Sequence, residues 1–229
     1  MFSSNLLHLL HLSDPALPIG GFSHSAGLET FVQSGIVKDK ETARDFVTQQ
    51  LSQNICHTDA AFVSLAFDAA CNNDMNTISR LDELCTAVKL PKEMRQASNK
   101  LGVRLLRIYH HKEAFAMLNQ YKQHLQTNKA FGHYCIVFGL LAYALQIDKE
   151  QALTGFYYNA ATGFVTNSVK LIPLGQQDGQ EIIMSLFPLI EELAETSLLP
   201  DENMIGYCCS SFDIRSMQHE QLYTRLYMS

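Results

Sequence analysis

The sequence predicts an all-α protein, and three observations lead to that class. Apolar residues recur at steps of three and four along most of the chain, which is the spacing of one face of a helix. No succession of alternating β-branched segments joined by hairpin turns occurs. No Gly/Ser-rich or Pro-rich linker and no repeat of solenoid length divides the 229 residues. We therefore predict a compact single domain of about eight to ten helices in an orthogonal or bundle-like packing.

The first half of the chain is expected to begin with an amphipathic helix that carries His8 and His11 on one face. After a loop, Ser23 or Ser25 should cap a short helix that ends near Gly35. Four helices then follow from the apolar spacing. They cover residues 39–56, 60–70, 78–88 and 91–109, and the last begins with Pro91, whose missing N–H would be unpaired in a first turn anyway.

In the second half, the spacing predicts helices over residues 113–125, 134–145 and 150–171. The middle one is almost wholly apolar and should be buried, and the last should stop before Pro173 and Gly175. Asp178 and Glu181 resemble a capping box that opens a helix toward Thr196, with a kink at Pro188.

Composition limits the function classes. Hydrophobic residues make up 47% and charged residues 17%, against a usual charged share of about 25%, so disorder is excluded and part of the surface should meet other protein. The net charge of −6 argues against a general nucleic-acid or anionic-membrane binder.

The longest apolar stretch, 131–145, is about five residues short of a membrane span. No Lys or Arg precedes Lys38 to form a secretion signal, so we expect a cytoplasmic protein. The six cysteines form no C-x-x-C pair, and most should be reduced and buried.

Catalytic motifs are missing from the sequence. There is no G-x-x-x-x-G-K-[ST] phosphate loop. The segment around Ser23 falls one residue short of G-x-S-x-G and lacks the sheet that such an elbow needs. His8 and His11 have no third ligand at motif spacing. We therefore expect no catalytic residue, no metal ligand and no cofactor; a metal-dependent hydrolase that uses the nine histidines remains as an alternative function.

Charge is unevenly distributed along the chain. Seven basic residues lie between Lys89 and Lys112 with only Glu93 opposing them, and Lys100, Arg104 and Arg107 share one helical face. No Lys or Arg occurs from Leu171 to Ile214. The basic stripe fits a solvated helix face, a surface that docks to an acidic protein, or phosphate contacts in an all-α nucleic-acid regulator.

Two segments look like contact surfaces. The Ser13–Glu29 loop is apolar and punctuated by Pro and Gly, as expected for a plain core lid or for a partner-docking loop. The final residues alternate apolar and aromatic side chains with polar ones instead of becoming polar. That tail should fold back on its own domain or insert into a groove on another chain, with Tyr and Arg as anchors.

Four segments in this order resemble the UreF family of urease accessory proteins over essentially the whole chain. They are SDPALPIGGFSHSAGLE at 13–29, RQASNKLGVRLLR at 95–107, NAATGFVTNSVKLIPLGQQDGQ at 159–180 and SSFDIRSMQHEQLYTRLYMS at 210–229. The resemblance implies an all-α homodimer without a catalytic site that joins UreD (also called UreH) and the GTPase UreG in delivering nickel to apo-urease. It also implies that this chain recruits and regulates UreG.

The resemblance assigns partner-binding roles by position and divides the chain into a UreF-like domain at 1–215 and a docking tail at 216–229. The tail residues should order on binding UreD, Arg225 should help hold the surface that binds UreG, and Lys170 should lie on a regulatory surface. The expected partner-binding residues are Gly20, Gly21, Phe22, Ser23, His24, Glu29, Lys170, Tyr223, Arg225, Leu226 and Tyr227.

Overall fold

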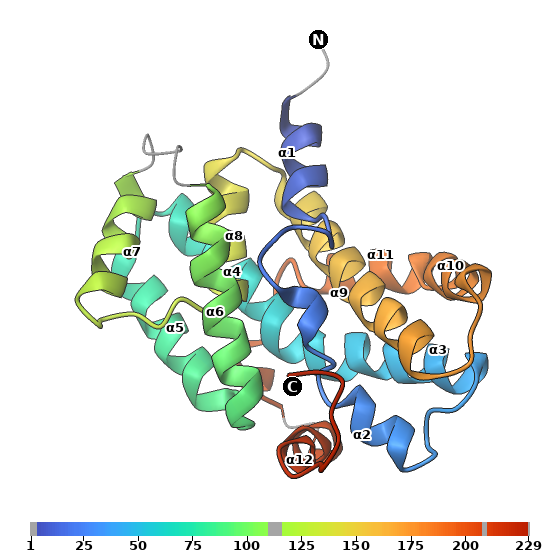
Figure 1. Cartoon of the computed structure of the whole chain (residues 1–229). Coiled ribbons are helices and arrows are strands. Elements are labelled where there is room, and N and C mark those ends of the chain that lie inside the picture. Colours follow the sequence, from blue (N-terminus) through green and yellow to red (C-terminus); the bar gives the residue numbers. More distant parts are fainter. Residues whose placement is uncertain (1–3, 110–115, 208–209, 229) are drawn as a thin grey trace.

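The computed structural model describes residues 4–109, 116–207 and 210–228, with the side chains of Ser4 and Phe22 outside the described part. Within these residues the chain is helical and contains no strand, which confirms the all-α class (Figure 1). The helices are α1 (Ser4–Leu12), α2 (Leu28–Gln33), α3 (Lys40–Gln49), α4 (Ala61–Cys71), α5 (Met75–Val88), α6 (Lys92–Ile108), α7 (Ala116–Gln126), α8 (Tyr134–Ala144), α9 (Lys149–Leu171), α10 (Gln176–Ser185), α11 (Phe187–Thr196) and α12 (Ser210–His219).

The two helices predicted at 39–56 and 60–70 form one continuous rod, because a π-helix from Gln50 to Ala60 joins α3 to α4. No Pro or Gly lies in this stretch to stop the helix. Hydroxyl groups satisfy backbone carbonyls along the wider turns: Ser52 donates to the Thr48 carbonyl over 2.7 Å and Thr58 to the Asn54 carbonyl over 2.6 Å. The break expected between the two helices is therefore absent.

The single kinked helix predicted from Asp178 to Thr196 is instead two helices, α10 and α11. Pro188 lies in the first turn of α11, where its lack of an N–H costs nothing. Asp178 does cap the start of α10, since its carboxylate accepts a 3.0 Å hydrogen bond from the Gly175 N–H. Glu181 does not complete that cap; it pairs with Lys40 on α3. This split adds one helix to those that the sequence predicts, and α12, for which no helix is predicted, adds another.

The core is built around α8, which is buried from Cys135 to Ala142 and packs between α4 and α6. The prediction that this helix is almost wholly buried is confirmed. Glycines let its neighbours come close: a Cβ at Gly139 would lie 2.5 Å from the Val63 carbonyl oxygen of α4. Among the described residues, no helix is both long and apolar enough to cross a membrane.

A buried carboxylate fixes the loop that leads into α8. Asp82 of α5 has no exposed surface and accepts the backbone N–H groups of Phe131, Gly132 and His133. Burial raises the pKa of Asp82, and the three N–H donors oppose that rise. This loop therefore has satisfied backbone donors at the start of the most buried helix.

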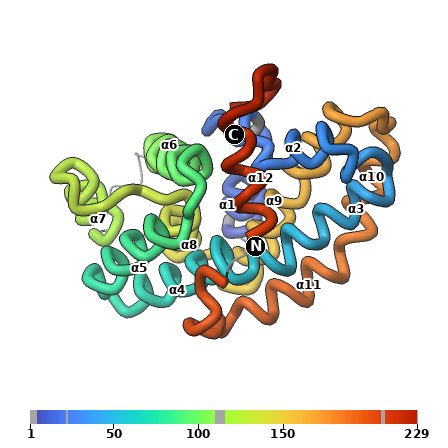
Figure 2. The backbone as a smooth tube through the Cα atoms, turned by 90° about the horizontal axis from the view of Figure 1, so that it is seen from below, coloured from blue at the N-terminus to red at the C-terminus, as the bar shows by residue number. Residues whose placement is uncertain are grey.

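The C-terminal helix covers one side of the molecule and adds Phe212 to the hydrophobic core. Figure 2 shows α12 near the middle of the view from below, close to α2, and α12 contacts both α2 and α6. Its inner face packs Phe212 against Phe31 with ring centroids 5.6 Å apart. The expected division between residues 215 and 216 falls inside α12.

Free cysteines are mostly interior. Cys56, Cys85 and Cys135 are buried and Cys71 is exposed, all four as free thiols. Cys208 and Cys209 lie outside the described residues. The expected burial of the cysteines thus holds for three of the four that the structure describes.

Replacing Gly102 with alanine should destabilise the fold, because a Cβ there would overlap the backbone carbonyl of Gly132. Overpacking of this kind costs about 1–3 kcal/mol, which urea unfolding would measure. The matched control is Gly163→Ala in α9, where a Cβ would meet nothing within 4 Å. That variant should gain about 0.5–1 kcal/mol from helix propensity, and equal effects at the two glycines would contradict the close packing of α6.

Candidate functional site

The Ser13–Glu29 loop lies directly against α6 and contains a 3₁₀ turn at Gly21–Ser23. Gly20 precedes this turn with a φ of 92°, a left-handed value that glycine adopts at little cost. A Cβ on Gly20 would overlap the Arg104 guanidinium, whose Nη1 donates a 2.8 Å hydrogen bond to the Ile19 carbonyl. Gly20 therefore allows the close approach, and Arg104 fastens the loop. The Phe22 side chain lies outside the described part.

The prediction that Ser23 or Ser25 caps α2 is wrong. The residue before α2 is Gly27, with a φ of 81° and no side-chain cap. The Ser23 hydroxyl donates instead to the Gly20 carbonyl over 2.7 Å and closes its own turn. A Cβ at Gly27 would lie 2.8 Å from Oγ of Ser216, so contact with α12 fixes this residue as glycine.

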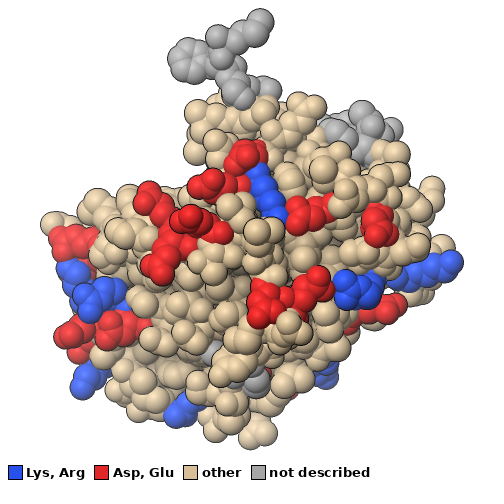
Figure 3. All heavy atoms as spheres, turned by 180° about the vertical axis from the view of Figure 1, so that it is seen from behind, with Lys and Arg blue, Asp and Glu red and all other residues tan. Residues whose placement is uncertain are grey.

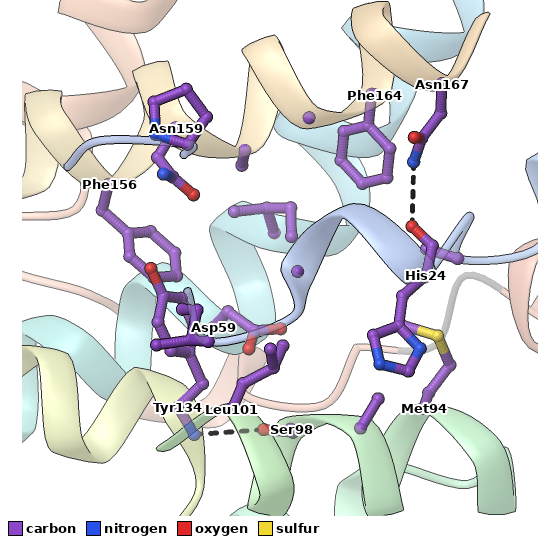
Figure 4. A pocket seen from close by; sticks show the side chains of 18 of the residues that line it. His24, Asp59, Met94, Ser98, Leu101, Tyr134, Phe156, Asn159, Phe164 and Asn167 are labelled. Carbon is purple, nitrogen blue, oxygen red and sulfur yellow. Dashed lines mark hydrogen bonds between the residues drawn. The ribbon is translucent and has the colours of Figure 1, made fainter. Parts of the chain in front are cut away.

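His24 lines a cavity of about 240 Å³ between the N-terminal loop, α6 and α9 (Figure 4). Its carbonyl accepts a 2.8 Å hydrogen bond from the Asn167 side chain of α9, and its ring lies beside Met94 of α6. Burial, followed by the charges of Lys100 and Arg104, lowers the pKa of His24. The ring is therefore held in its neutral form at neutral pH.

A buried ion pair borders the same cavity. Nζ of Lys89 lies 2.7 Å from Oδ2 of Asp59, and the two side chains are only 11% and 14% exposed. Burial opposes both charges, but each partner favours the other's ionised form, so the pKa of Asp59 is lowered and that of Lys89 is raised. Both residues also border a narrower cavity beside α12.

Glu29 holds the C-terminal tail, defined here as residues 220–228, against α2. Its side chain is 6% exposed. Oε1 accepts the Leu226 N–H over 2.8 Å, and Oε2 accepts the Tyr227 N–H over 3.2 Å. The Met228 N–H also donates to the Ser23 carbonyl over 2.9 Å. The tail thus folds back on its own domain through backbone donors.

Most side chains of the tail face the solvent, and within 220–228 only that of Tyr227 is buried. Tyr227 is 6% exposed, whereas Tyr223 is fully exposed and Leu226 and Met228 are exposed by 67% and 60%. Nη1 of Arg225 lies 2.7 Å from Oε1 of Glu93 on α6. The tail is therefore anchored by Tyr227 and Arg225 and presents an apolar outer side.

These contacts bring most of the expected partner-binding residues into one surface. The N-terminal group ends at Glu29, and the tail group meets it there. Lys170 is placed elsewhere: it is exposed in the last turn of α9, beside a small groove with α10. It lies one turn beyond Asn167, which bonds to the His24 carbonyl.

Two residues of this surface were missed in the sequence. His219 and Glu93 lie between Glu29 and Arg225 and connect them. The one available signal was that Glu93 is the only acid within the basic stretch 89–112. Nothing in the sequence pairs it with His219, which is 126 residues away.

Two of the basic residues on α6, Lys100 and Arg104, interact with the N-terminal loop. Arg104 bonds to the loop backbone, and the charges of Lys100 and Arg104 act on His24. His11, considered as a metal ligand, has its Nδ1 2.7 Å from the Tyr109 hydroxyl. Within the described ranges, no three His, Cys, Asp or Glu side chains gather to hold a metal ion.

Comparison with known proteins gives the family. The sequence profile of UreF matches residues 37–187. The chain belongs to the UreF family of urease accessory proteins. It is 49% identical to the urease accessory protein UreF of Actinobacillus pleuropneumoniae serotype 5b, over 96% of this chain and 97% of that protein. It is also 49% identical to that of Haemophilus influenzae strain Rd, over 96% and 94%, and 34% identical to that of Bacillus sp. TB-90, over 99% and 100%.

The lowered pKa of His24 predicts a pH effect on this site. A ring that is neutral when folded and titrates normally when unfolded makes the folded state less stable as the pH falls below the ordinary value of 6.5. NMR titration of the His24 ring should therefore give a value below 6.5, and Lys100→Met should raise it by removing a nearby positive charge. An unchanged value in Lys100→Met would contradict the electrostatic contribution.

Proposed function

We propose that this UreF-family protein acts as an adaptor in urease maturation. In this role it binds UreD (UreH) and the GTPase UreG, and it regulates the GTP-dependent delivery of nickel, the cargo, to apo-urease in the cytoplasm. Family membership supports the accessory role. The observation that carries the binding role is the tail, which is anchored by its backbone but exposes Tyr223, Leu226 and Met228.

Exposed apolar side chains of this size favour a partner. Burying one such side chain contributes about 1.5–3 kcal/mol to the free energy of binding, so several in one short segment can drive a specific contact. The tail lies beside the Ser13–Glu29 loop, so a partner seated on one segment meets the other. Lys170, on another surface, would serve a separate contact.

Regulation of UreG by this chain is a matter of differential binding. The sequence has no phosphate-binding loop, so the nucleotide chemistry belongs to the GTPase. An adaptor that binds one state of a GTPase more tightly than another shifts the balance between them. A difference of about 3 kcal/mol in binding free energy shifts that balance more than a hundredfold.

We also propose that two copies associate, through the apolar surface around α1. Leu6, Leu7 and Leu10 of α1 are exposed by 54%, 71% and 59%. A groove of about 460 Å³ runs beside Leu10 and is lined by Leu10 of α1, Tyr158 of α9 and Phe187 of α11, with Asp14 and Glu191 also on its wall. The described part of α1 carries no Lys, Arg, Asp or Glu, so two such helices can meet without like-charge repulsion.

The general surface is also suited to protein contacts. Figure 3 shows, on the side opposite to that of Figure 1, large uncharged areas between patches of carboxylates and scattered basic side chains. Charged residues are depleted at the centres of protein interfaces. An adaptor that contacts several proteins needs several such areas.

Removal of Leu222–Ser229 should abolish co-purification with UreD, because the apolar outer side of the tail is lost. Helical circular dichroism should be unchanged, since this segment lies beyond α12. The double variant Tyr223→Ala/Leu226→Ala should weaken binding in the same direction, and Tyr143→Ala, which alters an exposed tyrosine on α8, is the control. Full retention of UreD by the truncated chain would contradict the docking role.

Leu10→Asp should convert the proposed homodimer to a monomer, because a carboxylate would be buried at the contact without a partner. Light scattering after size-exclusion chromatography measures the mass directly. Leu199→Asp is the control, since Leu199 is 87% exposed in the segment after α11. A wild-type chain that elutes as a monomer contradicts the dimer, and a dimer that survives Leu10→Asp contradicts this surface.

A further inference from the structure

An imidazole lies between two carboxylates at the base of the tail. His219, the last residue of α12, has a fully buried side chain. Its Nε2 is 3.1 Å from Oε2 of Glu29, and its Nδ1 is 3.1 Å from Oε2 of Glu93. The Glu29 and Glu93 side chains are only 6% and 21% exposed. Helices α2, α6 and α12 therefore meet at one ring.

The hydrogen bonds of this ring depend on its protonation state. A neutral imidazole has one N–H donor and one acceptor nitrogen, and only the imidazolium donates from both. Glu29 is an acceptor here, since both of its oxygens receive N–H groups, those of Leu226 and Tyr227. Glu93 receives the Arg225 guanidinium. Both carboxylates therefore need a donor from His219, and the imidazolium satisfies both.

The charges of the cluster balance only when the ring carries its proton. Two carboxylates then face one imidazolium and one guanidinium. Loss of the proton leaves one ring nitrogen lone pair facing a carboxylate oxygen at 3.1 Å, in a buried position. A buried acceptor without a donor is costly, and more so when it is charged.

The free-energy cost of losing this proton affects the tail, because both carboxylates also hold the tail. Glu29 is the acceptor for two consecutive backbone donors of the tail, and Glu93 holds Arg225. The carboxylate that then faces the lone pair gains by turning toward water, and the tail loses either the Glu29 acceptor of its backbone donors or the Glu93 acceptor of Arg225. Tyr223, Leu226 and Met228, which already face solvent, would be released together.

We propose that His219 is the positioning residue of a latch, which holds the C-terminal tail on the domain while the ring is protonated and frees the tail when the proton is lost. The biological meaning of the latch rests on the proposed docking function of the tail. A held tail presents its apolar side chains in one fixed arrangement, and a freed tail can reach a groove at a distance.

The other charged and titratable groups around the cluster do not replace this donor. Arg215 of α12 lies over the Phe31 ring, with its guanidinium carbon 5.6 Å from the centroid. On α6, Arg95 donates to the carbonyls of Lys89 and Leu90. Burial and then the charge of Glu29 raise the pKa of Tyr227, which stays neutral. The remaining charged or titratable groups on the neighbouring elements include His24, Lys92, Lys100, Arg104, Arg107, Asp213 and Glu220.

The test measures amide hydrogen exchange of Leu226 and Tyr227 in the isolated full-length chain over a pH series, corrected for intrinsic exchange. Protection should fall by about tenfold as the pH rises through the titration of one group, the effect of one lost hydrogen bond to a charged group. In His219→Gln, the amide can place its NH₂ group at only one of the two ring-nitrogen positions and places its oxygen at the other, so protection should be low and the step absent. Protection that does not change with pH in the wild-type chain overturns the latch.

A second variant separates the latch from simple damage to the fold. In Glu93→Gln, the new amide can donate to Nδ1 while a neutral His219 donates to Glu29, so the tail should stay protected at high pH. His124→Gln is the matched control, because this ring on α7 contacts Ser79 and should leave the wild-type pH step unchanged. A normal pH step in His219→Gln or in Glu93→Gln would refute the role of this ring.

The outcome is independent of the docking function. Exchange is measured without a partner, so a chain that shows the pH step but does not capture UreD contradicts the docking proposal alone. A chain that captures UreD but lacks the step contradicts the latch alone.

Discussion

The surface described above depends on one buried carboxylate, that of Glu29. A carboxylate removed from water needs hydrogen-bond donors, and this one obtains two from the tail backbone and one from the His219 ring. It therefore ties α2 to α12 and to the last residues of the chain. Without that requirement, an apolar segment such as 220–228 would have little reason to adopt one path across the domain.

The same constraint separates two kinds of residue in the tail. Backbone N–H groups and the inward Tyr227 side chain hold the tail, while Leu226 and Met228 face outward. Arg225 belongs to the first group in the free chain, since it pairs with Glu93. A partner that recruits Arg225 must replace that ion pair, whereas a partner that binds Leu226 only has to exclude water from it. The arginine thus contributes selectivity more readily than affinity.

The fold class and most helices could be predicted from apolar spacing, because burial of one face is what stabilises these helices. The burial of α8 and the helix ending before Pro173 both followed from residue type alone. The junction of α3 and α4 did not, since a π-helix depends on how the wider turns are packed and not on a breaker residue. Gly27 in place of a serine cap likewise reflects contact with Ser216, a neighbour distant in sequence.

The site was predictable only where single segments carried the signal. The glycine turn at Gly20 and the tail stand out locally, and both lie in segments that carry the resemblance to the UreF family. The contact that links them could not be found in the same way. Glu93 and His219 lie on different helices, α6 and α12, and only the fold brings their side chains within 3.1 Å of each other. Long-range pairs of this kind have no spacing that a single sequence reveals.

In the proposed adaptor role, this protein would influence its partners through the free energy of its own conformations. A tail that is already ordered loses less conformational entropy on binding, by about 1 kcal/mol for each backbone residue fixed in advance. A tail held too firmly would instead have to break its contacts with Glu29 before it could move into a groove elsewhere. In the proposed latch, the tail is held by its own backbone N–H groups, and Glu29 and the ionisable His219 ring bind it. The exposed side chains of the tail are therefore the same in the held state and in the freed state. The balance between them is then set at His219, a residue that itself need not touch the partner.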